Sequence, residues 1–131
     1  MALRGIRNNN PLNLKYDENA WQGRTGQDAD GFAIFALIEN GFRAGVKNFV
    51  NNQRKLERIT IRQYLDRFAS DSKEVDKKQY AKFICDRIGV LESTLIVTVD
   101  PYKFVAAQAL FETPGAVFTE DMQEKVRRTI S

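Results

Sequence analysis

The stretch Gly5–Phe35 reads GIRNNNPLNLKYDENAWQGRTGQDADGFAIF and predicts a turn-rich β segment ahead of a run of helices. Residues 8–11, NNNP, form a turn, since Asn tolerates left-handed backbone and Pro presets φ. The run Leu12–Tyr16 alternates apolar and polar residues, which is strand periodicity. After a glycine-rich loop, Phe32–Phe35 supplies a return strand. We therefore expect residues 12–35 to form a small antiparallel lobe in which these two runs pair.

Beyond residue 35 the apolar spacing becomes helical. Glycine and proline, together with Ser/Thr/Asp capping residues, mark where the helices begin and end. Leu91–Val99 is expected to be an extended connection, and the uncharged run Phe104–Phe111 should lie in the most enclosed helix. The expected helices are about Ile38–Lys55, Thr60–Ala69 with a Thr60/Gln63 capping box, Asp76 to the terminating Gly89, Pro101–Glu112 after an Asp100 cap, and a last helix capped by Thr119. The expected fold class is α+β, with a helical body over residues 38–131.

The length of 131 residues predicts one domain, and 43% hydrophobic with 28% charged residues is typical of a globular protein. No run approaches the ~20 apolar residues of a membrane-spanning helix. The N-terminus lacks the apolar core of a signal peptide. We therefore expect no membrane span, and a virion, a secretion machine or a membrane pore would have to deliver the chain to a cell wall.

The absence of histidine and the single cysteine, Cys85, limit the chemistry. Histidine-based triads, histidine-containing metal sites and an intrachain disulfide are excluded. No metal or other cofactor is expected, and a general acid must be a carboxylic acid, a lysine or a tyrosine. The net charge of +3 is mild and no block of five or six basic residues occurs. Solvated helix faces are the first explanation of this positive charge, and a surface that binds the cell wall or nucleic acid is the second. Nucleic acid is not an expected partner.

The opening RGIRNNNPLN, followed by WQG, FAIF and GFRA, resembles a family of small phage and prophage proteins that open with R-G-I-R-N-N-N-P-x-N. These are virion structural proteins or lysozyme-like murein hydrolases. The order of motifs also looks like the β lobe of flagellar-type glucosaminidases. The resemblance implies a lysozyme-like domain, circularly permuted so that its acid helix lies at the end of the chain. It also implies a virion-associated protein, or one that stays in the host cytoplasm before release to the wall.

Glu112 is the expected general acid. It ends an apolar helix, where burial and the negative helix end favour the protonated carboxyl that glycosidic cleavage requires. The segment resembles the lysozyme-superfamily pattern of an Ala-rich helix that ends in Glu before a Gly-containing loop. Phe111 stands where the phage family has His, and Thr113-Pro114 where it has Asn. This departure implies either a changed substrate or lost activity, and an ordinary surface Glu remains the alternative.

The second carboxylate and the substrate contacts are expected in the lobe and on one helix. The carboxylates of the lobe are Asp17, Glu18, Asp28 and Asp30. Each is more often a solvated turn residue, and Asp30 is preferred among them. Aromatic rings stack on sugars, and amides bond sugar hydroxyl and acetamido groups. The candidate substrate contacts are Asn10, Asn13, Trp21 and Tyr80. Core packing is an equal alternative for Trp21.

Three functions follow from these observations. The first is a peptidoglycan glycosidase or lytic transglycosylase that cleaves murein glycan strands. The second is a catalytically inactive virion structural or binding protein on the same fold, with other virion proteins as its partners. The third is a basic helical protein that binds nucleic acid or another protein.

Overall fold

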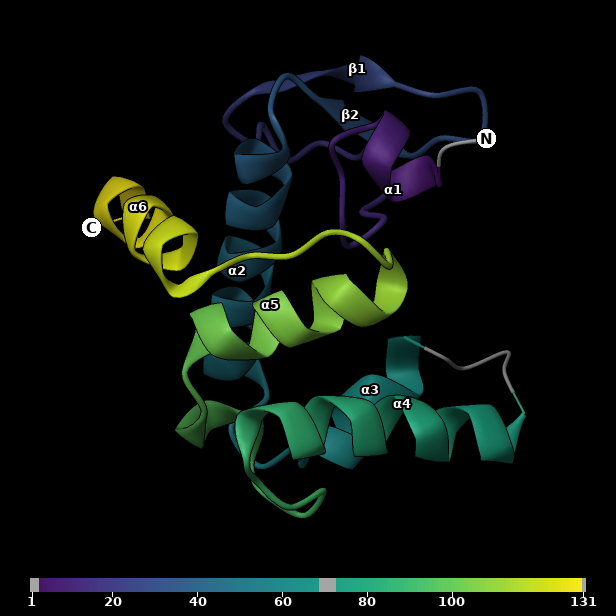
Figure 1. The fold of residues 1–131 in the computed structure, drawn as a ribbon, viewed down its shortest axis with the longest axis vertical. Helices are drawn as coiled ribbons and strands as arrows, with labels where there is room; N and C mark the ends of the chain where they lie inside the picture. Colours follow the sequence, from purple (N-terminus) through teal and green to yellow (C-terminus); the bar gives the residue numbers. More distant parts are fainter. Residues whose placement is uncertain (1–2, 69–72, 131) are drawn as a thin grey trace.

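The computed structural model describes residues 3–68 and 73–130. It is α+β, as expected, with a small lobe at one end of a helical body (Figure 1). The elements are α1 (Arg4–Arg7), β1 (Arg24–Gln27), β2 (Ala33–Phe35), α2 (Ile38–Lys55), α3 (Ile61–Phe68), α4 (Glu74–Ile88), a 3₁₀ turn (Ile96–Thr98), α5 (Pro101–Glu112) and α6 (Glu120–Ile130).

The sheet pairs β1 with β2 in antiparallel register, Gln27 opposite Ala33. The predicted pairing of Leu12–Tyr16 with Phe32–Phe35 is therefore wrong in its main partner. Only a single antiparallel bridge, Lys15 with Phe32, joins those two runs. The physical reason is Asn13, whose φ of 51° turns the chain and interrupts an extended strand.

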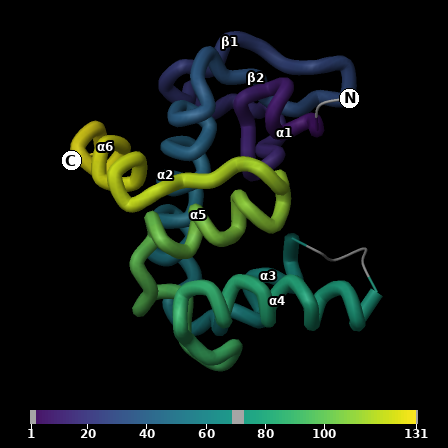
Figure 2. Tube along the Cα trace, in the orientation of Figure 1, coloured from purple at the N-terminus to yellow at the C-terminus, as the bar shows by residue number. Residues whose placement is uncertain are grey.

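The N-terminal segment packs closely on α2, and Figure 2 shows the two side by side. Gly41 and Gly45 make this approach possible. A Cβ on Gly41 would lie 2.1 Å from the carbonyl oxygen of Asn9, and one on Gly45 would lie 2.8 Å from a methyl group of Leu12. Only glycine leaves room for the N-terminal segment at these two positions, and the lobe is thereby packed against the helical body.

Most helix boundaries agree with the sequence. α2 and α5 have the predicted bounds, and the Asp100 carboxylate caps α5 by accepting the amide hydrogens of Tyr102 and Lys103. The capping box forms: the backbone N–H of Gln63 donates to the Thr60 hydroxyl oxygen, 3.1 Å away. The last residue of the expected helix Thr60–Ala69 lies outside the described residues.

Two expectations about the helical body need correction. α4 begins at Glu74 after Lys73, so the expected start at Asp76 was two residues late. Asp76 lies within the first turn, where its negative charge favours the helix without capping it. The connection Leu91–Val99, which was expected to be extended, contains a 3₁₀ turn. Ile96 in this turn is fully buried, and its packing holds the stretch against the core.

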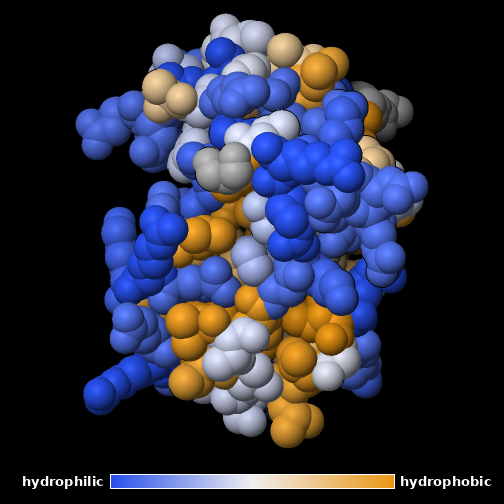
Figure 3. All heavy atoms as spheres, turned by 90° about the vertical axis from the view of Figure 1, so that its left-hand side faces the viewer, coloured by the Kyte–Doolittle hydropathy of each residue, from blue (hydrophilic) through white to orange (hydrophobic). Residues whose placement is uncertain are grey.

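The core lies between α2, α4 and α5, with α3 and α6 on its flanks. The rings of Phe49 and Phe104 stack at its centre, 4.4 Å apart. α5 is buried from Phe104 to Ala109, which confirms the enclosed helix over most of the predicted run. On the face in Figure 3, apolar surface gathers over the lower half, whereas the upper half is mostly polar.

Candidate functional site

Glu112 is the last residue of α5 and is half-buried. Burial raises the pKa of its carboxyl, because removing water disfavours the charged form, while a hydrogen bond from Tyr80 acts in the lowering direction. The Tyr80 hydroxyl donates to Oε1 of Glu112 at 2.7 Å. No ion pair to Glu112 exists within the described part of the chain. The arrangement suits a carboxyl group that keeps its proton more readily than an exposed one.

Tyr80 reaches Glu112 because α4 packs along α5. The Tyr80 ring is 3% exposed and stacks on the ring of Phe111, with centroids 4.4 Å apart. Nε2 of Gln108 donates to the Tyr80 hydroxyl at 3.1 Å. The structure therefore places Tyr80 behind Glu112 as a buried hydrogen-bond partner, whereas the sequence suggested an accessible sugar contact. Gln108 was not singled out, although a buried amide in an apolar helix is a recognisable signal.

The residue after Glu112 joins the acid to the N-terminal lobe. Thr113 is 1% exposed, and its hydroxyl donates to the carbonyl oxygen of Pro11 at 2.8 Å. Gly5 packs against the same side chain, with an added Cβ only 2.2 Å from the Thr113 hydroxyl oxygen. Glu112 consequently lies where the lobe, α4 and α5 meet.

The candidate second carboxylate, Asp30, lies on the surface. Its side chain is 67% exposed and forms an ion pair of 2.9 Å with Arg4. Asp28 is the more tightly held of the two, because it accepts hydrogen bonds from the Asn8 side chain and from the backbone amide of Phe32. These hydrogen bonds lower the pKa of Asp28. No contact in the structure brings Asp30 to Glu112.

The candidate lobe contacts are largely occupied within the protein. Asn10 is fully buried, and its Nδ2 donates to the carbonyl oxygens of Leu14 and Ala33. Trp21 is half-buried and packs against a small cluster that includes Phe35. Asn13 is different, since its buried Oδ1 has no hydrogen-bond partner among the described residues. Asn10 thus holds the lobe together, and Asn13 is the amide that retains an unused acceptor.

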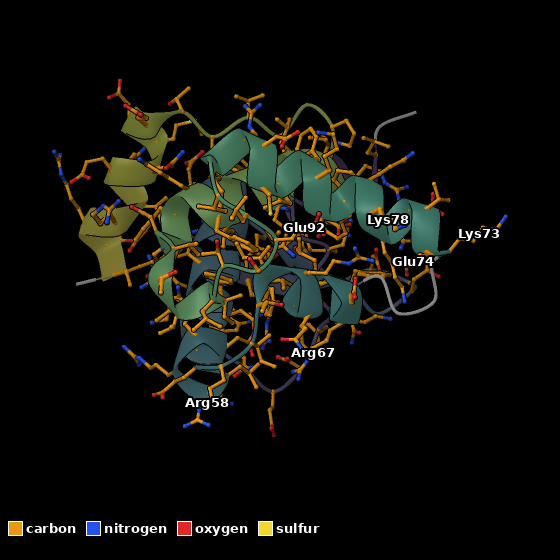
Figure 4. The ribbon with its side chains drawn as sticks, turned by 90° about the horizontal axis from the view of Figure 1, so that it is seen from below. Arg58, Arg67, Lys73, Glu74, Lys78 and Glu92 are labelled. Carbon is orange, nitrogen blue, oxygen red and sulfur yellow. The ribbon has the colours of Figure 1, made fainter. Side chains whose placement is uncertain are left out.

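The underside of the helical body carries a cluster of charges (Figure 4). Arg62 of α3 is paired there with the carboxylates of Asp66, Glu74 and Glu92. The surrounding cations that Figure 4 labels have no ion pair among the described residues; these are Arg58, Arg67, Lys73 and Lys78. This surface is therefore suited to attract a polyanion.

Two general features bear on the class of site. In the described ranges 3–68 and 73–130, no group of three or more His, Cys, Asp or Glu residues could hold a metal ion. The same residues include no helix with the length and apolar composition that crossing a membrane requires.

Comparison with known proteins gives one relative. Over 93 residues the chain is 32% identical to Protein P5 of Pseudoalteromonas phage PM2. The chain is related to a phage protein. The match covers 68% of this chain and 58% of Protein P5, so the chain spans little more than half the length of that relative. No protein-family model matches the chain.

Proposed function

We propose that the protein is a phage or prophage peptidoglycan glycosidase, or lytic transglycosylase, and that Glu112 is its general acid. The observation that carries this proposal is the half-buried Glu112 carboxyl, with its raised pKa, at the meeting point of the lobe, α4 and α5. A catalytic acid must hold its proton near neutral pH and lie beside a substrate-binding lobe, and these features support both conditions.

In this function Glu112 protonates the oxygen of the glycosidic bond, which leaves with the bonding electrons. An oxocarbenium-like sugar then reacts with water or with one of its own hydroxyl groups, and the proton lost in that step returns to Glu112. One carboxylate is enough for the second route. The exposed position of Asp30 in its pair with Arg4 supports a helper role at most.

The substrate would be murein glycan strands. The relationship to Protein P5 supports a phage origin. We extend this to association with the virion and with other virion proteins. The unpaired cations beneath α3 and α4 would favour approach to an anionic cell wall, where ionic attraction raises the association rate.

A catalytically inactive virion structural protein is the second candidate. It is favoured by the internal use of Asn10, whose Nδ2 donates to two backbone carbonyl oxygens and whose Oδ1 accepts from the backbone N–H of Leu14. Phe111 and Thr113 at the end of α5 also depart from the phage-family pattern. In that case the lobe would serve assembly and Glu112 would be an ordinary buried carboxyl group.

The deciding experiment is release of soluble fragments from purified sacculi of several hosts. Wild type should release fragments, and Glu112→Gln should lose at least roughly 100-fold, because Gln keeps the shape but cannot donate the proton. Asp30→Asn is the matched control and should retain most activity. A fully active Glu112→Gln refutes the assignment of the acid, whereas an inert wild type on all sacculi favours the structural role.

A further inference from the structure

The hydroxyl group of Tyr80 has one hydrogen, and the structure shows where that hydrogen goes. Nε2 of Gln108 donates to the Tyr80 oxygen at 3.1 Å, so the amide occupies a lone pair of the hydroxyl. The Tyr80 hydrogen is then directed at Oε1 of Glu112, 2.7 Å away. Gln108, Tyr80 and Glu112 thus form a chain of hydrogen bonds with one direction.

This chain is rigid because its two inner members are buried. Tyr80 is 3% exposed and Gln108 is 2% exposed. The Tyr80 ring is also held by stacking on Phe111, with the two ring planes 9° apart. A buried hydroxyl and a buried amide need partners; here the Tyr80 hydroxyl has two and Nε2 of Gln108 has one. Water therefore does not compete for the hydroxyl hydrogen that points at Glu112.

We infer that Tyr80 is a positioning residue that occupies Oε1 of Glu112 and leaves Oε2 as the oxygen that donates the proton, with Gln108 orienting the Tyr80 hydroxyl. This inference rests on the proposed function and deepens it. A protonated carboxyl carries its hydrogen on one oxygen, and an oxygen that already accepts a hydrogen bond is the poorer place for it. The donor oxygen is thereby fixed before substrate arrives.

The same contact helps the proton to leave. When Oε2 transfers its proton to the glycosidic oxygen, Glu112 becomes a carboxylate, and the bond between the anomeric carbon and that oxygen breaks. The Tyr80 hydroxyl stabilises the new charge, because hydrogen bonds to a charged group are stronger than those to a neutral one. Donation from Gln108 strengthens the Tyr80 hydroxyl as a donor. Burial raises the pKa of Glu112, and the hydrogen bond from Tyr80 limits how far that pKa rises.

Few groups influence the pKa of Glu112. Burial and the Tyr80 hydrogen bond are the two causes that shift the pKa of Glu112. Burial, followed by the charge of Glu112, raises the pKa of Tyr80, so Tyr80 keeps the hydrogen that it donates to Glu112. Gln108, which lies on α5 with Glu112, bonds to Tyr80 through an uncharged amide group. A change at Tyr80 should therefore be visible directly in the titration of Glu112.

The test is a carbon-13 NMR titration of the glutamate carboxyl groups, with the Glu112 signal assigned from its absence in Glu112→Gln. In Tyr80→Phe, which keeps the ring and its stacking on Phe111, the pKa of Glu112 should rise. Gln108→Met should raise it by a smaller amount. The matched control is Tyr64→Phe, because Tyr64 is equally buried and its hydroxyl contacts Asn52 instead.

Sacculus digestion supplies the second readout. Tyr80→Phe should reduce kcat roughly 10- to 100-fold with KM nearly unchanged, the range expected when an acid is present but misplaced. The alkaline limb of its pH–rate profile should move to higher pH, since the acid is lost only above its raised pKa. A residue with a merely structural role would lower stability without moving that limb.

The outcomes separate the two proposals. An unchanged Glu112 titration in Tyr80→Phe overturns the positioning role, whatever the activity. A raised pKa with inert wild-type protein refutes the enzymatic function and leaves the hydrogen-bond chain established. Should Tyr80→Phe fail to fold, Gln108→Met decides, because it removes the orienting amide and leaves the tyrosine in place; an unshifted titration there overturns the inference.

Discussion

The hydroxyl of Thr113 donates a 2.8 Å hydrogen bond to the carbonyl oxygen of Pro11, although 102 residues separate the two in the chain. Both residues are buried, so neither partner can exchange this bond for one to water. The contact ties the end of α5 to the N-terminal lobe, directly beside Glu112. Because the bond is buried and joins distant parts of the chain, its removal should lower the stability of the fold.

Thr113→Val should lower the free energy of unfolding by about 1–3 kcal/mol, because the Pro11 carbonyl oxygen would remain buried without a partner. Urea unfolding at neutral pH measures the difference. Thr113→Ser retains the hydroxyl and should lose less. Equal losses in the two variants would show that the methyl group, and not the hydrogen bond, carries the effect.

Gly41→Ala should be strongly destabilising, since the added Cβ would lie 2.1 Å from the Asn9 carbonyl oxygen. Backbone atoms cannot move aside cheaply, so we expect a loss of at least about 1–3 kcal/mol or a failure to fold. Gly26→Ala is the control, because an added Cβ there meets no atom within 4 Å. Thermal unfolding of both variants tests the close packing of the lobe on α2.

Glu112→Gln should make the free energy of unfolding depend less on pH above 4.5, the ordinary pKa of a glutamate. The pKa of Glu112 is raised in the folded state, so the native protein binds the proton more tightly than the unfolded chain. The corresponding stability is present below the unfolded pKa and is lost as pH rises through the folded pKa.

Relative to wild type, the Gln variant should therefore gain stability between pH 4 and neutrality. Urea unfolding at a series of pH values measures this trend. A loss of stability of Glu112→Gln relative to wild type as pH rises from 4 to neutrality would contradict the raised pKa.

Arg62→Gln should destabilise the junction of α3 and α4, because three carboxylates would lose their common partner. Solvent screening limits the loss to roughly 1–2 kcal/mol, and added salt should reduce the difference from wild type. Lys82→Gln breaks the exposed pair with Asp86 and should change stability little. Urea unfolding at low and high salt distinguishes the two positions.

The sequence by itself determined the helices whose ends carry strong local signals. Asp100 followed by proline starts α5, Thr60 and Gln63 form the capping box of α3, and Gly89 ends α4 with a φ of 74°. These signals act between neighbouring residues, so no knowledge of the rest of the fold is needed. Glu112 was singled out on the same local grounds, as the last residue of an apolar helix.

Only the tertiary structure decided what surrounds that residue and how the lobe is built. Asn13 breaks the expected strand, and Arg24–Gln27 pairs with β2 in its place. Tyr80 became a buried partner of Glu112, and Asn10 became a support of the lobe, because packing and hydrogen bonds with distant segments outweigh the preferences of single residues. Local patterns specify the elements, whereas burial and the matching of polar groups across the chain specify their contacts.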